Sequence, residues 1–241
     1  MTFPMREQNY TASPSQSAMQ SNTTNPIRNR FNGAVTTRVI PHPHRAFAFE
    51  VTFNPSQWPD FLRGQKPPKH FHPLQEEYIE VVEGALCVED DEQEYTLTPR
   101  EGEFLIRPWV NHRLYPPAGY DGDIKFLLAG EETPELFKLD TIFFENWYGY
   151  QDETVVAGKG IDLIQVLSMF DAGGSYMSFP WWVPFGRTLS MTLGVVVGRW
   201  IGGLLGYQPY HRKWTFDWDL ACRKMEQSIF QRRFADRAKT V

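Results

Sequence analysis

The stretch GQKPPKHFHPLQEEYIEVVEG, residues 64–84, carries the strongest structural signal in the chain. His70 and His72 stand two residues apart, so on a β-strand their side chains point to the same face and can reach one ion. The four residues after His72 are suited to a turn, which lets Glu77 on the next strand add a carboxylate. Neutral imidazole and carboxylate together suit zinc, iron, manganese, nickel or copper.

A fourth ligand is expected from a later strand. The sequence RPWVNH, residues 107–112, ends at His112 and follows a glycine turn. Only six histidines occur in the chain, and three of them fall in this arrangement. Glu76 is the alternative carboxylate, but only Glu77 leaves six residues before Gly84.

The other three histidines read as surface residues. His42 and His44 lie in a proline-bound turn with no carboxylate at a matching distance. His211 lies beside Arg212 and Lys213 and is expected to be exposed to solvent.

The two histidine segments resemble the two motifs of the cupin superfamily. The match covers residues 64–84 at every position and residues 102–112 in part, where Trp109 stands for the usual glycine. Pro116 also replaces a frequent asparagine. The resemblance implies a jelly-roll barrel of six to eight strands around one metal, with one or two coordination positions open to substrate, water or dioxygen. The ligands that it implies are His70, His72, Glu77 and His112.

The sequence around the motifs, residues 31–130, is typical of short antiparallel strands. Segments rich in strand formers are separated by turn residues at a spacing of about 8 to 12 residues. Strand parity places Ile79 and Val81 on the same side as Glu77. The expected strands are Ala46–Phe53, Glu77–Glu89 with an interruption at Gly84, Glu94–Leu97, Gly102–Arg107, Arg113–Tyr115 and Asp123–Ala129.

The ends of the chain differ from the barrel. Residues 1–30 are rich in Ser, Thr, Asn, Gln and Pro, which predicts a disordered polar tail. Residues 131–241 predict a helical extension, so the fold class is mainly β, a cupin jelly-roll barrel with a helical, apolar C-terminal extension. Helices are expected from Thr133 to Gly149, from Gly160 to Gly173, and from Trp214 to Phe234.

The third predicted helix is amphipathic. Trp218, Cys222, Met225 and Ile229 share one stripe. The opposite face, which contains Arg223, Lys224, Arg232 and Arg233, is expected to be solvated.

An apolar segment, residues 188–207, contains a single charge, Arg199. Its length is at the threshold for a membrane span, and four glycines recur every fourth residue, a pattern that permits close helix contact. Together with flanking aromatic residues it suggests membrane association through residues 181–210, without crossing, so that Arg199 reaches the headgroups. The alternative is a hydrophobic hairpin buried against the barrel or in a homodimer.

Composition narrows the function classes. The net charge of −5 gives no general attraction to nucleic acid. Cys87 and Cys222 are too few for a disulfide framework or a thiolate zinc site and read as two unrelated thiols. The N-terminus lacks a secretory signal pattern, so a cytoplasmic protein is expected, on the cytosolic face of a membrane if it associates with one.

Some polar or aromatic residues near the barrel strands are candidates for the pocket. They are Arg107, Trp109, Arg113 and Lys125. An inward-pointing member could bind an anionic or phenolic substrate oxygen, whereas surface or core packing is the alternative.

The chain also resembles the small cupin-domain oxidoreductases of fungal natural-product pathways. That resemblance implies a metal-dependent enzyme, with iron the first expectation among the divalent metals, acting on a phenolic or polyketide-like small molecule. A cupin isomerase or cyclase that uses the metal as a Lewis acid is an alternative. A metal-stabilised ligand-binding module without catalysis is another.

Overall fold

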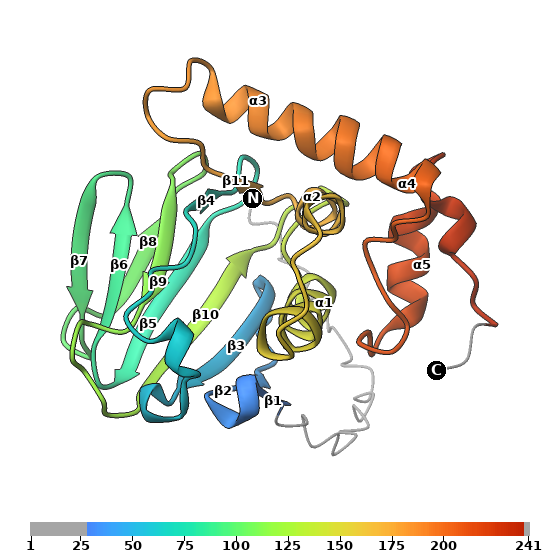
Figure 1. Ribbon diagram of the computed structural model, residues 1–241. Helices are drawn as coiled ribbons and strands as arrows, with labels where there is room; N and C mark the ends of the chain where they lie inside the picture. The colour runs from blue at the N-terminus through green and yellow to red at the C-terminus, as the bar shows by residue number, and fades with distance from the viewer. Residues whose placement is uncertain (1–27, 239–241) are drawn as a thin grey trace, which may run out of the picture.

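Two antiparallel β-sheets form the body of the computed structural model, which describes residues 28–238 (Figure 1). The first sheet has the strand order β1-β2-β3-β10-β5-β8, and the second has the order β11-β4-β9-β6-β7. The first comprises β1 (Arg28–Arg30), β2 (Val35–Val39), β3 (Arg45–Phe53), β10 (Ile124–Glu131), β5 (Glu77–Glu83) and β8 (Glu103–Ile106). The second comprises β11 (Tyr176–Met177), β4 (His70–Phe71), β9 (His112–Tyr115), β6 (Leu86–Asp90) and β7 (Gln93–Leu97).

One hydrophobic cluster fills the space between the sheets. Phe126 of the first sheet belongs to it together with Val88 of the second. Burial alternates residue by residue along β10, as expected for a strand with one face in the core. Ile79 and Val81 are both buried in this cluster, so the parity predicted from Glu77 is confirmed.

The predicted class, a mainly β fold with a helical extension, is confirmed. The described residues contain more strands than the six to eight that the resemblance implies. Two of them lie outside the predicted barrel: β1 falls in the segment assigned to the polar tail, and β11 belongs to the extension. Residues 1–27 of the predicted tail lie outside the described residues.

The extension packs beside and above the sheets (Figure 1). Helix α1 (Thr141–Gln151) continues into a π-helical turn (Asp152–Val156) and is followed by α2 (Leu163–Ala172). A long helix then runs as α3 (Gly186–Leu193), a π-helical segment (Gly194–Ile201) and α4 (Gly202–Leu205). The chain ends with α5 (Trp218–Glu226) and a 3-10 turn (Arg232–Phe234). Three other 3-10 turns lie at Phe31–Gly33, Pro55–Gln57 and Asp60–Leu62.

The predicted start of the first helix at Thr133 is wrong, because the helix begins at Thr141. Asp140 caps it by accepting a hydrogen bond from the N–H of Phe143 at 2.9 Å. The preceding segment is held by Gln75, which accepts from the Leu139 N–H at 2.9 Å. The expected stop at Gly149 is also wrong, since this glycine lies inside α1.

The third predicted helix is shorter than expected and ends at Glu226. Lys224, assigned to the solvated face, is buried and pairs with Asp140 at 2.5 Å. Ile229, assigned to the buried stripe, lies beyond the helix and is exposed. The sequence pattern misleads here because α5 docks on the N-terminal end of α1, where the Asp140 carboxylate needs a cation.

The long helix Gly186–Leu205 is, among the described residues, the one with the length and hydropathy of a membrane span. Length and composition do not distinguish such a span from a helix packed on protein. Three of its glycines, Gly194, Gly198 and Gly202, face α2: a Cβ added at Gly198 would lie 2.5 Å from the carbonyl carbon of Leu167. Arg199 does not reach outward as expected but pairs with the buried Asp171 of α2 at 2.6 and 2.9 Å.

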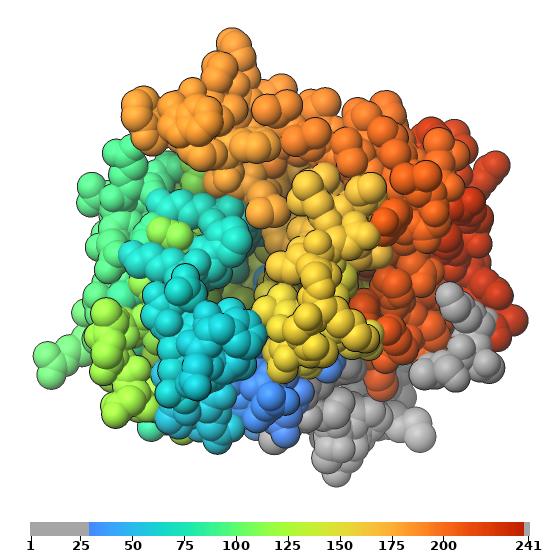
Figure 2. Space-filling model, viewed as in Figure 1, coloured from blue at the N-terminus to red at the C-terminus, as the bar shows by residue number. Residues whose placement is uncertain are grey.

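The outward face of this helix and the turn before it are apolar and exposed. Trp181, Trp182 and Phe185 of the turn expose 90%, 69% and 85% of their surface. Leu204 and Leu205 continue the exposed face at the far end. Figure 2 shows the segment in orange along one edge of the molecule.

Replacing Gly198 by Ala tests the contact between the long helix and α2. Because the added methyl group meets backbone, we expect the free energy of unfolding to fall by about 2 kcal/mol. Gly160→Ala is the control, since nothing lies within 4 Å of its added Cβ. Urea unfolding of both variants gives the answer. A gain in stability for Gly198→Ala, as helix propensity alone would produce, would contradict the packing.

Candidate metal centre

Strands from both sheets bring the predicted ligands together at one end of the sandwich. His70 on β4 pairs in register with His112 on β9. His72 follows β4 directly, and Glu77 is the first residue of β5 in the other sheet. Trp109 donates its backbone N–H to the His72 carbonyl at 2.9 Å. Its φ is 71°, in the left-handed region, which explains why this position favours glycine.

The four side chains form a compact donor set. One potential ligand atom from each of His70, His72, Glu77 and His112 lies within 4.8 Å of the others. The Glu77 Oε2 atom lies 2.9 Å from His112 Nε2 and 3.4 Å from His72 Nε2. All except the half-buried His70 are buried.

Burial and mutual charge set the protonation of these groups. The pKa of His70 is lowered well below its usual value, first by burial and then by the neighbouring imidazoles. Burial also lowers the pKa of His72. Burial opposes ionisation of Glu77, yet the neighbouring imidazoles of His112 and His72 hold its pKa well below the usual range. Burial would lower the pKa of His112, but Glu77 outweighs it and raises that pKa.

The donor set fits a metal cation. His112 Nδ1 lies 3.0 Å from the Val110 carbonyl, which can only accept, so the proton of this contact sits on Nδ1. The Nε2 atom then faces the Glu77 carboxylate at 2.9 Å, and either a second proton or a bound cation would join these two acceptors. Both ring nitrogens of His72 are buried without a hydrogen bond among the described residues. A divalent ion would satisfy all of these atoms, and the Val110 contact would orient the imidazole.

The remaining candidates of the sequence lie elsewhere. Glu76 accepts a hydrogen bond from the Tyr78 hydroxyl at 2.5 Å, outside the donor set. His42 and His44 lie in an exposed turn, as expected. The expectation that His211 is exposed is wrong: it is half-buried, and its ring packs on Trp214 at 4.6 Å.

A cavity of about 320 Å³ adjoins the donor set. His70, His72 and Glu77 form part of its wall, and most of the rest is apolar or aromatic. The barrel contributes Phe31, Val35, Phe53, Trp58, Pro67, Pro68, Lys69, Arg113, Leu114, Phe126 and Leu128. The extension contributes Leu139, Phe143, Phe144, Trp147, Tyr148, Gln151, Ile161, Leu163, Val166, Phe170, Ser175 and Met177.

One of the four pocket candidates from the sequence lines this cavity. Arg113 reaches it, but its guanidinium is engaged by the Glu89 carboxylate at 2.8 and 3.0 Å. Arg107 is exposed, and Trp109 stacks on Phe71 instead. Lys125 lies beside Glu83 at 4.0 Å.

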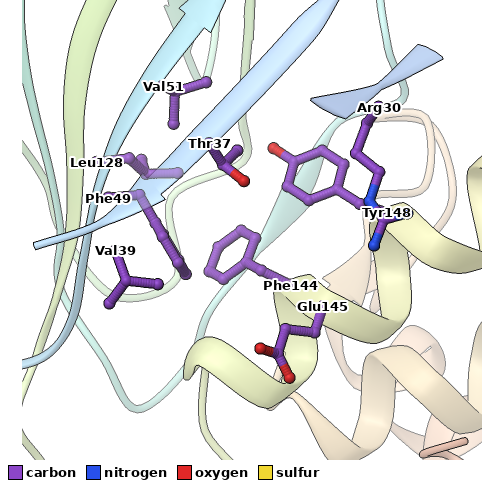
Figure 3. Close-up of a pocket in the computed structure, with 9 residues that line it drawn as sticks. All are labelled: Arg30, Thr37, Val39, Phe49, Val51, Leu128, Phe144, Glu145 and Tyr148. Atoms are coloured by element: carbon purple, nitrogen blue, oxygen red, sulfur yellow. The ribbon is translucent and has the colours of Figure 1, made fainter. Parts of the chain in front are cut away.

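A smaller cavity of about 20 Å³ lies between α1 and the strands β2 and β3 (Figure 3). The rings of Phe144 and Tyr148 project from α1 into this region, and both also line the larger cavity. The Tyr148 hydroxyl points toward Thr37 (Figure 3). Burial, followed by the charge of Glu77, raises the pKa of Tyr148 to about 12, so its phenol is neutral at ordinary pH.

Sequence reasoning missed the contribution of the extension to the cavity. Much of the wall comes from α1, α2 and the short strand β11, which joins the ligand-bearing sheet. The run FFENWYGY, residues 143–150, offered a signal, since so many aromatic residues in one helix exceed what a single packed stripe needs.

The jelly-roll sandwich with three histidines and a glutamate at one end makes this protein a cupin, as its motifs predict. It is 45% identical over 214 residues to a probable oxidoreductase, yanE, of Aspergillus niger, covering 86% of this chain and 83% of the relative. An oxidoreductase of Arthrobotrys oligospora is also 45% identical, over 218 residues, with 88% and 86% covered. The epoxidase atD of Aspergillus terreus is 36% identical, with 86% and 68% covered. The chain therefore belongs to the same family as these fungal oxidoreductases.

Two other comparisons add little. No family model matches the sequence. A sugar phosphate isomerase of the cupin superfamily from Silicibacter pomeroyi is 24% identical with a TM-score of 0.32, covering 44% of this chain and 67% of its own. The structure of Fe(II) HppE is 15% identical with a TM-score of 0.33, covering 44% and 55%. These weak likenesses say nothing about the reaction.

Two glutamine substitutions test the donor set. Glu77→Gln removes the buried carboxylate, so we expect its metal content to fall at least about tenfold. Glu76→Gln is the matched control and should retain the metal content of the wild type. Elemental analysis of the purified proteins measures both, with His72→Ala as a further variant expected to lose metal. A greater loss in Glu76→Gln than in Glu77→Gln would place the carboxylate one residue earlier.

Proposed function

We propose that this protein is a metal-dependent oxidoreductase that acts on a phenolic or polyketide-like aromatic molecule. His70, His72, Glu77 and His112 hold one divalent transition metal. The observation that carries the proposal is the set of three imidazoles and one carboxylate, whose potential ligand atoms all lie within 4.8 Å of one another, beside a cavity large enough for a small molecule. The names of the relatives support oxidation as the reaction class.

The cavity wall supports an aromatic substrate. Phe143, Trp147 and Phe170 lie close together in it, with ring centroids of Trp147 and Phe170 4.7 Å apart. Such faces favour flat apolar rings through stacking and edge contacts. The two basic residues at the wall, Lys69 and Arg113, share a single carboxylate, Glu89, at 3.0 and 2.8 Å, so it offsets one of their two positive charges.

Iron is the metal proposed, because imidazole and carboxylate ligands suit it and oxidation calls for a redox-active ion. When bound, it would supply the electron transfer that oxidation by dioxygen requires. The residues of the chain bind and orient the ring, and the apolar wall excludes water. Tyr148 lines both cavities, and the hydroxyl of its neutral phenol points toward the smaller one (Figure 3).

Two alternatives differ in the metal that they need. An isomerase or cyclase would use zinc or nickel as a Lewis acid. A binding module would hold a ligand without turnover. The names of the relatives favour oxidation over both.

Metal exchange tests the reaction class. The protein is stripped with a chelator and reloaded with Fe(II) or Zn(II), and oxygen consumption is followed with a panel of one- and two-ring phenols. We expect activity with Fe(II) and none with Zn(II) or without metal, because iron changes its oxidation state readily and zinc does not. Product formed with zinc and without oxygen consumption would favour the Lewis-acid enzyme. Binding without turnover under any metal would favour the binding module.

We further propose that the exposed apolar surface of residues 181–205 contacts lipid on the cytosolic face of a membrane without crossing it. The support is the aromatic turn of Trp181, Trp182 and Phe185, whose side chains suit a membrane interface. Because Arg199 is engaged by Asp171 and Gly194, Gly198 and Gly202 pack on α2, the outer face of the helix is the one available to lipid. Contact there would bring the barrel near a source of poorly soluble substrate.

Serine substitution of the aromatic turn tests lipid contact. We expect the triple variant of Trp181, Trp182 and Phe185 to lose most of its binding to phospholipid vesicles in a sedimentation assay, since about 2 kcal/mol of apolar burial goes with each side chain. Phe216→Ser is the control, because Phe216 is 77% exposed outside this surface. Wild-type protein that stays in the supernatant would remove the lipid proposal and leave the metal centre intact.

A further inference from the structure

The short strand β11 places side chains of the extension in the wall of the cavity that His70 and His72 also line. It pairs antiparallel with β4, so that Met177 lies opposite His70 and Tyr176 opposite Phe71. Met177 and His70 both line the cavity, whereas Tyr176 and Phe71 pack together on the other face with ring centroids 5.8 Å apart. Ser175 shares the parity of Met177 and also lines the cavity.

The hydroxyl of Ser175 is buried and unpaired. The residue exposes 1% of its surface, and its Oγ atom has no hydrogen-bond partner among the described residues. Its backbone is held in place, because the Ser175 N–H donates to the Phe170 carbonyl at 2.9 Å. A buried hydroxyl without a partner is costly, so such a group calls for an explanation.

Three other polar side chains of the cavity are engaged or point elsewhere. Lys69 and Arg113 pair with Glu89. The Tyr148 hydroxyl points toward Thr37 and the smaller cavity (Figure 3). Besides His72, three wall residues keep a buried donor without a hydrogen-bond partner among the described residues: Trp58, Arg113 and Ser175. Of these, Ser175 is the one that the β4–β11 register, when continued, places opposite His72.

We propose that Ser175 donates a hydrogen bond to an oxygen atom, phenolic or carbonyl, on the ring of the bound aromatic molecule. This inference rests on the proposed function and adds the contact that fixes the orientation of the ligand. A ring held between the aromatic side chains of α1 and α2 would direct its oxygenated edge to Ser175 and hence to the histidine side of the cavity. A ring without oxygen would fill the same space with no such preference.

The chain offers a matched control for this contact. Ser168 on α2 is also fully buried with an unpaired hydroxyl, but it does not line the cavity. Ser168→Ala and Ser175→Ala thus remove the same group from the same extension, and only one of them changes the cavity wall.

Isothermal titration calorimetry of the full-length, zinc-loaded protein tests the proposal without turnover. The probes are 2-naphthol and 2-methylnaphthalene, which differ in the oxygen. We expect Ser175→Ala to bind 2-naphthol about fivefold more weakly than wild type, as loss of one neutral hydrogen bond predicts, and to bind 2-methylnaphthalene unchanged. Ser168→Ala should match wild type with both probes.

Several results would overturn the inference. These are unchanged 2-naphthol affinity in Ser175→Ala, an equal loss for 2-methylnaphthalene, the same loss in Ser168→Ala, or no binding of 2-naphthol by wild type. Zinc content measured in the same samples separates failure of the Ser175 contact from failure of the metal centre. If the protein holds no zinc but Ser175→Ala still weakens only 2-naphthol binding, the metal-site proposal fails and the Ser175 contact stands. If the protein holds zinc but Ser175→Ala binds 2-naphthol as wild type does, the Ser175 contact fails and the metal-site proposal stands.

Discussion

The carboxylate of Glu77, buried between two imidazoles, is the constraint on which the rest of the structure depends. A carboxylate out of water is unstable unless positive charge or hydrogen bonds surround it. The two sheets meet that demand by converging, since β5 supplies the glutamate while β4 and β9 supply histidines. The converging strands create an end of the sandwich that must be closed against water, and the helices of the extension close it.

The barrel was predictable because its signals are local. The two-residue interval between His70 and His72 and the alternation around Ile79 depend only on strand geometry. Even the unusual Trp109 keeps the backbone conformation that the motif requires. The meeting of the four candidate ligands was predictable for the same reason, since each stands at a fixed interval within one of two short segments.

The extension was less predictable because its polar residues find partners far away in sequence. The sequence places Lys224 on the surface, but in the fold it pairs with Asp140. In the same way, the sequence suggests Arg199 as a membrane anchor, but in the fold it pairs with Asp171. The same limit applies to Ser175, whose position depends on pairing between β11 and β4, a hundred residues apart. No periodicity in the sequence encodes contacts of this kind.

The pairing of β11 with β4 also limits where a small molecule can enter the cavity. The seam between barrel and extension is hydrogen-bonded along the strand that bears His70, so opening it would disturb that histidine. A molecule entering the cavity must therefore pass where the wall meets solvent. Ile161 and Leu163, just before and at the start of α2, are the wall residues with large exposed surface, and Pro67 is exposed on the barrel side. Access through this rim leaves the histidine strand undisturbed during each passage.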